Sequence, residues 1–134
     1  MKNQFNGHIV SGLGRGAKFL AMPVYSNIFR KELGGSPFLG TLNVIIPESH
    51  RSAIDAYMDN GKKYENLLNQ EGKPTGGIII NKFRLIIDGT KLNCVGVRPI
   101  LTSHDNSVIE IVAIENIRKR FDLNNNNELI VEYN

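Results

Sequence analysis

The chain has 134 residues, of which 41% are hydrophobic and 22% are charged. This length and composition predict one folded domain over residues 1–134 and exclude a disordered or collagen-like chain. The formal net charge is +3, which suits phosphate-bearing ligands but is too small for a nucleic-acid-binding tail. No nucleic-acid partner is therefore expected.

Cysteine usage and hydropathy indicate the compartment. Cys94 is the single cysteine, so the chain cannot form an internal disulfide, which favours a reducing, cytoplasmic location. No apolar stretch approaches the roughly 18 residues that a membrane-spanning helix needs. Residues 1–6 are too polar for a signal peptide. We expect a cytoplasmic protein without a membrane partner.

The first part of the chain predicts a strand, a short extended piece, a helix and a buried strand, in that order. Alternating apolar and polar residues over Phe5 to Val10 indicate a half-buried strand, and residues 18–22 are interpreted as a second, short extended piece. Pro23 suits the first turn of a helix, and the apolar residues that follow have helical spacing up to Gly34. Thr41 to Ile46 is rich in β-branched residues, which predicts a buried strand.

The middle of the chain predicts a β-hairpin after a polar region. Residues 49–59 suggest a helical turn, and residues 60–76 have the composition of an exposed loop. Apolar residues at 77–87 and 91–97 flank Asp88-Gly89. This pattern is typical of a hairpin with a tight two-residue turn.

The last part predicts a strand at 108–113, a short helix at 115–121 and a strand at 129–133. Many short strands, two short helices and no repeated strand–helix–strand rhythm argue against a doubly wound parallel sheet. A small, mostly β barrel fits these elements better.

A glycine-rich stretch is the densest chemical signal. Ser11-Gly12-Leu13-Gly14-Arg15-Gly16-Ala17-Lys18 has three alternate glycines and two basic residues. Such a loop can bring backbone N–H groups close to phosphate oxygens. The spacing differs from a Walker A loop, where Ser or Thr would replace Phe19, and Pro23 prevents the long helix of a dinucleotide-binding fold. A glycine-rich bend at a barrel corner is the alternative.

Thr41 and Asn43 form a second cluster. Alternate side chains of a strand point to the same face, so these two residues present neutral oxygens side by side. Such oxygens, with phosphate oxygens and water, suit magnesium. The alternative is structural, because Thr is a good strand residue and Asn a good turn residue.

The third cluster runs from Thr102 to Glu110. Glu110 lies among apolar residues and either faces solvent by alternation or occupies a polar site with a partner. Ser103, His104 and Asp105 are adjacent in sequence and so lack the geometry of a catalytic triad. The three histidines are too scattered for a zinc motif.

Several motifs together resemble the archaeal CTP-dependent riboflavin kinases. They are G-x-x-V-S-G-L-G-x-G at residues 7–16, Tyr25 with Phe29 and Leu33-Gly34, Pro37, Gly40-Thr41-Leu42-Asn43, Thr102-x-His104, Ile109-Glu110-Ile111-Val112-Ala113, Ile117-Arg118 and Phe121-x-Leu123. The likeness spans nearly the whole chain. Only residues 55–74 lack a recognisable motif.

The resemblance implies a six-stranded, cradle-loop barrel like that of riboflavin synthase. It also implies transfer of the terminal phosphate of CTP to the ribityl hydroxyl of riboflavin, giving FMN and CDP, with Mg²⁺ as cofactor. The partners would be riboflavin/FMN and CTP/CDP, and we expect a monomer. Backbone groups near residues 115–118 would read the cytosine edge.

The resemblance also assigns residues to these ligands. Magnesium is assigned to Thr41 and Asn43, and the flavin to Thr102 and Glu110. Glu110 is also the candidate catalytic residue, which would orient the attacking hydroxyl or accept its proton. The nucleotide is assigned to Leu13, Gly14, Arg15, Gly16, Ala17, Lys18, Glu115, Asn116, Ile117 and Arg118.

Three departures from the family pattern stand out, and two other functions remain open. Gly35 replaces a common aromatic residue, Ile114 a usual proline, and Asn125 to Asn127 an acidic turn. The first departure concerns flavin affinity more than chemistry. The alternatives are a barrel that binds a flavin or nucleotide without turnover, and a swapped-hairpin DNA-binding protein, which would lose affinity linearly with log salt.

Overall fold

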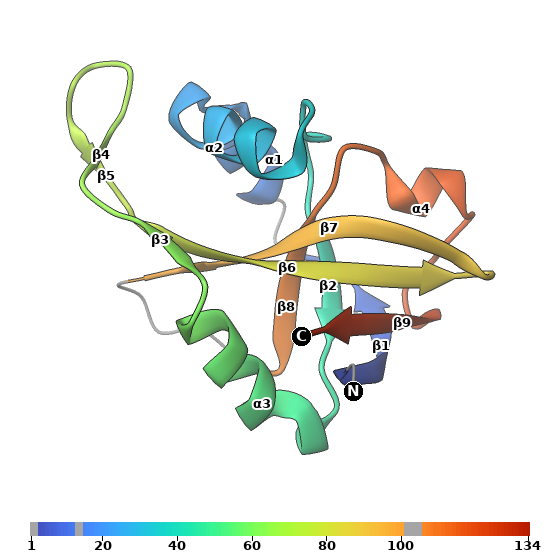
Figure 1. The fold of residues 1–134 in the computed structure, drawn as a ribbon. Coiled ribbons are helices and arrows are strands. Elements are labelled where there is room, and N and C mark those ends of the chain that lie inside the picture. The colour runs from blue at the N-terminus through green and yellow to red at the C-terminus, as the bar shows by residue number, and fades with distance from the viewer. Residues whose placement is uncertain (1–2, 13–14, 101–105) are drawn as a thin grey trace.

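Six antiparallel strands close into a barrel (Figure 1). The computed structural model describes residues 3–12, 15–100 and 106–134. The barrel strands are β1 (Asn3–Val10), β2 (Leu42–Ile45), β6 (Ile78–Ile87), β7 (Thr90–Pro99), β8 (Val108–Val112) and β9 (Glu128–Tyr133). Their order around the barrel is β6-β7-β8-β2-β1-β9, and β9 pairs with β6 to close the ring. The predicted mostly β barrel is confirmed.

Helices and short strands surround the barrel. The helices in the described residues are α1 (Arg15–Ala21), α2 (Pro23–Leu33), α3 (Glu48–Asp59) and α4 (Ile117–Arg120), and the short strands are β3 (Lys62–Tyr64), β4 (Leu67–Leu68) and β5 (Pro74–Thr75). β3 pairs with β6, whereas β4 and β5 form a hairpin that projects from the barrel (Figure 1). None of these helices has the length and hydrophobicity needed to cross a membrane.

Alternate residues of the strands fill the barrel interior. Ile9, Val44, Leu85, Ile109 and Val131 are fully buried there. Burial of an aliphatic side chain of this size contributes roughly 1.5–3 kcal/mol. The helix α3 adds Ile54 and Met58 to the same core, because these residues lie four positions apart on one helix face.

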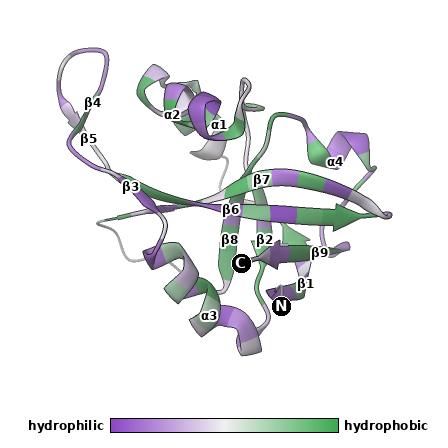
Figure 2. Cartoon of the chain, in the orientation of Figure 1, coloured by the Kyte–Doolittle hydropathy of each residue, from purple (hydrophilic) through white to green (hydrophobic). Residues whose placement is uncertain are grey.

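A second apolar cluster lies on the outside of the barrel, beneath α1 and α2. Leu20 and Phe29 from these helices pack with Ile78, Val97 and Val112 from the strands. The central strands are therefore apolar on both faces, and Figure 2 shows mainly hydrophobic residues along β8. This explains the three consecutive isoleucines at residues 78–80, of which Ile79 belongs to the inner core and Ile78 and Ile80 to the outer cluster.

The expectation of an extended piece at residues 18–22 is wrong, because this segment belongs largely to α1. Phe19 stacks on Tyr25 of α2, with ring centroids 4.3 Å apart, and Leu20 is fully buried. Contact with α2 thus favours a helix where the sequence alone suggested a strand. The prediction that Pro23 begins a helix is confirmed, because α2 starts there.

Residues 49–59 form most of a 12-residue helix, α3, instead of a single turn. The predicted exposed loop at 60–76 contains the short strands β3 to β5. The described part of the chain thus has two helices, α1 and α3, beyond the two that were expected. The predicted hairpin is confirmed, and Asp88 and Gly89 both have positive φ, as its turn requires.

Candidate active site

The outer face of β2 and β8 carries the polar residues of the site. Leu42 and Val44 of β2 point into the barrel core, so the alternating Asn43 lies on the opposite face. Asn43 faces Glu110 directly across the ladder and is only 8% exposed. This agrees with the prediction that Thr41 and Asn43 share a face.

The glycine-rich stretch lies directly on these two residues. A Cβ at Gly12 would collide with Asn43 Nδ2, and a Cβ at Gly16 would lie 2.7 Å from Thr41 Oγ1 and 3.1 Å from the Thr41 backbone nitrogen. Any side chain would therefore push the chain away from β2. These two glycines allow the backbone to pack closely against the strand. A simple bend at a barrel corner would not need such close packing.

Glu110 is a half-buried carboxylate beside Thr41. The Thr41 hydroxyl donates a hydrogen bond to Glu110 Oε1 over 3.3 Å. Burial raises the pKa of Glu110, and the hydrogen bond from Thr41 offsets part of that rise. No cation in the described ranges forms an ion pair with it. Of the two alternatives that the sequence left open for Glu110, solvent exposure and a polar site with a partner, the structure shows the second. The helices α1 and α2 cover this part of the outer face, where Val97 and Val112 are buried.

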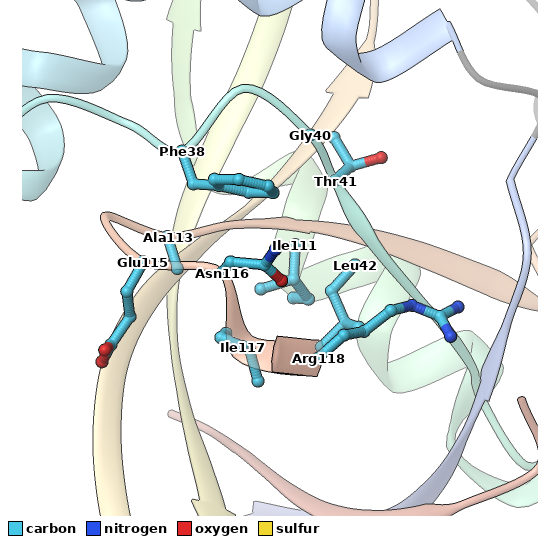
Figure 3. A pocket seen from close by; sticks show the side chains of 10 residues that line it. All are labelled: Phe38, Gly40, Thr41, Leu42, Ile111, Ala113, Glu115, Asn116, Ile117 and Arg118. Atoms are coloured by element: carbon cyan, nitrogen blue, oxygen red, sulfur yellow. The ribbon is translucent and has the colours of Figure 1, made fainter. Parts of the chain in front are cut away.

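A small pocket begins at Thr41 and extends toward α4. Figure 3 shows its lining residues: Phe38, Gly40, Thr41, Leu42, Ile111, Ala113, Glu115, Asn116, Ile117 and Arg118. The Phe38 N–H donates a 2.8 Å hydrogen bond to the Ala113 carbonyl. This bond holds the segment before β2 against the segment after β8.

Arg118 ties the α4 side of the pocket to the start of the glycine-rich stretch. Its Nη2 donates hydrogen bonds to the carbonyl of Val10 over 3.1 Å and to Asn125 Oδ1 over 2.9 Å. Asn125 Nδ2 in turn donates to Ser11 Oγ over 2.7 Å. Arg118, from one predicted nucleotide-binding segment, is therefore held against Val10 and Ser11, just before the other predicted segment at residues 13–18.

Some predicted residues lie apart from this cluster. Lys18 borders another hollow, between the start of α2 and the β4–β5 turn, with Met22 and Glu71. Ala17 is exposed on α1. Leu13, Gly14, the Arg15 side chain and Thr102 lie outside the described residues.

Sequence reasoning missed two residues of the site. Phe38 lines the pocket, and Asn125 links Arg118 to Ser11. Phe38 stands three residues before Thr41, so the bracketing turn residues Pro37 and Gly40 could have drawn attention to it. No local signal points to Asn125, because a run of asparagines is typical of any turn.

The similarity to known proteins covers the segments that form this site. A sequence model of the CTP-dependent riboflavin kinases (CTP-dep_RFKase, described as a domain of unknown function, DUF120) matches residues 9–133. The riboflavin kinase of Methanococcus maripaludis strain C5 is 35% identical over 127 residues, which cover 90% of this chain and 92% of that protein.

Two further relatives cover the chain as fully. The riboflavin kinase of Methanococcus aeolicus is 34% identical over 133 residues, 94% of each chain. The riboflavin kinase of Methanobrevibacter smithii is 29% identical over 130 residues, 97% of this chain and 99% of that protein. Since the family match includes almost the whole barrel and the cluster on β2 and β8, the chain belongs to the CTP-dependent riboflavin kinase family.

Proposed function

We propose that the protein transfers the terminal phosphate of CTP to the ribityl hydroxyl of riboflavin and releases FMN and CDP. One observation carries this proposal beyond family membership. The glycine-rich stretch contacts Thr41 and Asn43, and Thr41 contacts Glu110. Elements able to bind phosphate, a cation and a reacting hydroxyl are thus within side-chain reach of one another.

CTP would lie between the glycine-rich stretch and α4. Its base would enter the pocket next to Thr41, and its phosphates would extend toward Gly12 and Gly16. The fixed guanidinium of Arg118, next to the carbonyl of Val10, would add positive charge near the phosphates. Phosphoryl transfer depends mainly on such placement and on charge neutralisation.

The donor set beside the glycine-rich stretch fits magnesium. Thr41 and Asn43 offer a hydroxyl and an amide oxygen, both neutral and both hard, and magnesium usually keeps other positions for substrate phosphate and water. A magnesium ion bound there would neutralise charge on the transferred phosphate. We assign Thr41 and Asn43 as the residues that hold it.

Glu110 would act on the riboflavin hydroxyl. Its raised pKa brings the carboxylate closer to the range in which a general base works well near neutral pH. As a carboxylate it can accept the hydroxyl proton or fix the hydroxyl by a hydrogen bond. In either role it must be ionised.

The test is FMN formation from riboflavin, with CTP and ATP in parallel, with and without Mg²⁺, and flavins separated by chromatography. We expect FMN with CTP and Mg²⁺ only. N43A should reduce the rate at least 100-fold, whereas the matched control N93A changes an exposed asparagine on β7 and should have no effect. FMN from ATP would contradict the choice of donor.

A further outcome separates the proposal from the binding-only alternative. If the wild-type protein binds riboflavin but forms no FMN with either nucleotide, the barrel is a flavin-binding module and the kinase proposal is wrong. Full activity of N43A at low Mg²⁺ would contradict the assignment of magnesium to Asn43 and would leave the kinase proposal intact.

A further inference from the structure

An arginine is buried at the end of β7. Arg98 is only 5% exposed, and its Nη1 donates a 2.6 Å hydrogen bond to Asp55 Oδ1 of α3. Its Nε and Nη2 are also buried, but neither has a hydrogen-bond partner among the described residues. A buried cation with unsatisfied donors adds little stability, and an apolar side chain of similar volume often serves as well. Stability alone therefore does not account for an arginine at this position.

Asp55 joins Arg98 to the segment before β8. Its Oδ1 accepts the bond from Arg98, and its Oδ2 accepts a 3.2 Å hydrogen bond from Asn106 Nδ2. Arg98 lies at the end of β7, and Asn106 lies shortly before β8 begins. One carboxylate on α3 therefore holds both strands at the end where the chain passes from one to the other.

The same ends of β7 and β8 carry the candidate catalytic carboxylate. Glu110 pairs with Val97, and within the described residues the β7–β8 ladder ends at that pair. Arg98 is the next residue of β7, and Asn106 precedes Glu110 by four positions. On its other edge β8 is held by β2. The bonds to Asp55 thus fix the β7 side of β8 at the point where strand pairing stops.

We infer that Asp55 and Arg98 are positioning residues, which set the place of Glu110 relative to riboflavin. This inference rests on the kinase function and on the role of Glu110 proposed above. Val97 belongs to the outer cluster, so the next residue, Arg98, points to the opposite face of the strand. Arg98 and Asp55 therefore act through the backbone of β7 and β8 and do not touch the substrate.

The nucleotide side of the site is held by a different set of bonds. Arg118 is bonded to Val10 and Asn125, and neither Asp55 nor Arg98 takes part in that network. Loss of the bond between Asp55 and Arg98 should therefore disturb riboflavin and the reacting hydroxyl more than CTP. A change confined to one substrate is the signature by which positioning differs from general loss of structure.

The substitution R98M tests this inference, because methionine fills much of the space but removes the charge and the hydrogen bond. We expect kcat to fall about tenfold and KM for riboflavin to rise, as for a misplaced catalytic group, while KM for CTP stays within a factor of about two. The melting temperature should be unchanged or higher. An arginine with a purely structural role would instead lower the melting temperature and leave the kinetic constants unchanged.

Three further variants support the comparison. R98K keeps the cation near Asp55 and should recover part of the kcat that R98M loses. D55N keeps the shape of the side chain but loses the charge and one acceptor atom, so kcat should fall about threefold. D55N also carries the test if R98M does not fold. The matched control is R84M, because Arg84 also lies beside a buried carboxylate, Glu132, at 3.8 Å, but on the β6–β9 ladder. It should leave kcat and both KM values unchanged.

The outcomes separate this inference from the function on which it rests. If wild type forms FMN, and R98M and D55N keep its kcat and its KM for riboflavin, the inference is wrong and the kinase proposal stands. An equal loss of activity in R84M, or an equal rise in KM for CTP, would indicate general damage and would also overturn the inference.

If wild type forms no FMN, the kinase proposal fails, and binding of riboflavin, measured by the quenching of its fluorescence, decides the role of Arg98. Weaker binding to R98M than to wild type, with the melting temperature unchanged, would support positioning on the riboflavin side. Equal binding to both, or no binding to wild type, would overturn the inference.

Discussion

Two partly buried carboxylates near the same helices have opposite environments. Glu32, on α2, accepts a hydrogen bond from the Tyr64 hydroxyl and lies 3.3 Å from Lys62 Nζ, so it joins α2 to β3. Among the described residues, Glu110, on β8, has only the Thr41 hydroxyl as a hydrogen-bond partner. The fold therefore supplies a cation to one carboxylate and none, within the described residues, to the other.

The pKa values follow this difference. For Glu32, burial raises the pKa, but the bonds from Tyr64 and Lys62 outweigh it and the net pKa is lowered. For Glu110, burial dominates and the pKa is raised. A carboxylate that costs stability when ionised, and that lies beside a glycine-rich loop, is typical of a functional group rather than a structural one. Glu32 is the structural counterpart.

The largest expected effect is on catalysis. E110Q should lower kcat/KM for FMN formation by roughly 100-fold or more, the usual range for loss of a general base, whereas E32Q should leave kcat/KM within a factor of about two. Steady-state rates with CTP and riboflavin measure both. Equal losses of kcat/KM in E110Q and E32Q would contradict the distinction between a functional Glu110 and a structural Glu32.

The contact that positions Glu110 can be disturbed from the glycine-rich stretch. G16A places a methyl group against Thr41, including its backbone nitrogen, so the strand or the loop must move. We expect about a tenfold loss of kcat and some loss of stability, because the clash with Thr41 outweighs the gain in helix propensity that alanine brings. G76A is the control, since its Cβ would meet only Tyr25 Oη at 3.8 Å. Full activity of G16A would mean that the close contact has no catalytic role.

The pH dependence sharpens the same comparison. Because Glu110 must be ionised and its pKa lies above the usual 4.5, activity should rise with pH through a midpoint higher than that of an ordinary glutamate. E110Q should lose this acidic limb, whereas E32Q should keep it. Rates measured from acidic to neutral pH in buffers of constant ionic strength would show the difference, and a limb retained in E110Q would assign it to another group.

The smallest effects are on stability, and they have opposite signs. At pH 7, E32Q should lower the free energy of unfolding by about 1 kcal/mol, since it weakens the hydrogen bond from Tyr64. E110Q should raise it by roughly 0.5 kcal/mol, since it removes an ionised carboxylate that burial disfavours. Urea denaturation at several pH values measures both changes.

The pH dependence of these stabilities follows from the two pKa shifts. The contribution of Glu32 is present above about pH 5 and is lost as pH falls through its lowered pKa. The contribution of Glu110 favours the folded state at low pH and is lost as pH rises through its raised pKa. The gain from E110Q should therefore shrink on acidification. A gain that grew instead would contradict the raised pKa.

Local patterns predicted most of the fold. Asp88-Gly89 marked the β6–β7 hairpin, and Pro23 and Gly34 marked the ends of α2, because each of these residues determines its own backbone geometry. The helix α1 was missed because packing on α2 decides its conformation. Such packing joins segments whose contact no local window can show.

The site was predicted only in part for the same reason. Alternation put Thr41 and Asn43 on one face of the strand, but it left open whether Glu110 faces solvent or a polar site. The cover over Glu110 comes from α1 and α2, about eighty residues earlier in the chain. The bond from Arg118 to Val10 spans 108 positions. Only the resemblance to a family linked these segments before the structure did.

The closure of the barrel has a consequence for how the protein is made. The strand β1 pairs with β2 on one side and with β9 on the other, with Asn3 opposite Tyr133. As the chain leaves the ribosome, β1 emerges first and β9 last. One edge of β1 therefore stays unpaired until β9 has been made, open to pairing with other nascent chains.

The same order of synthesis delays the assembly of the candidate active site. The glycine-rich stretch emerges early, but Glu110, Arg118 and Asn125 follow about a hundred residues later. Ligands can therefore assist only the final step of folding, when the last strands close the ring. Riboflavin or CTP, added during cell-free translation, would stabilise chains that have completed folding. Neither would rescue chains whose folding has stopped before the ring closes.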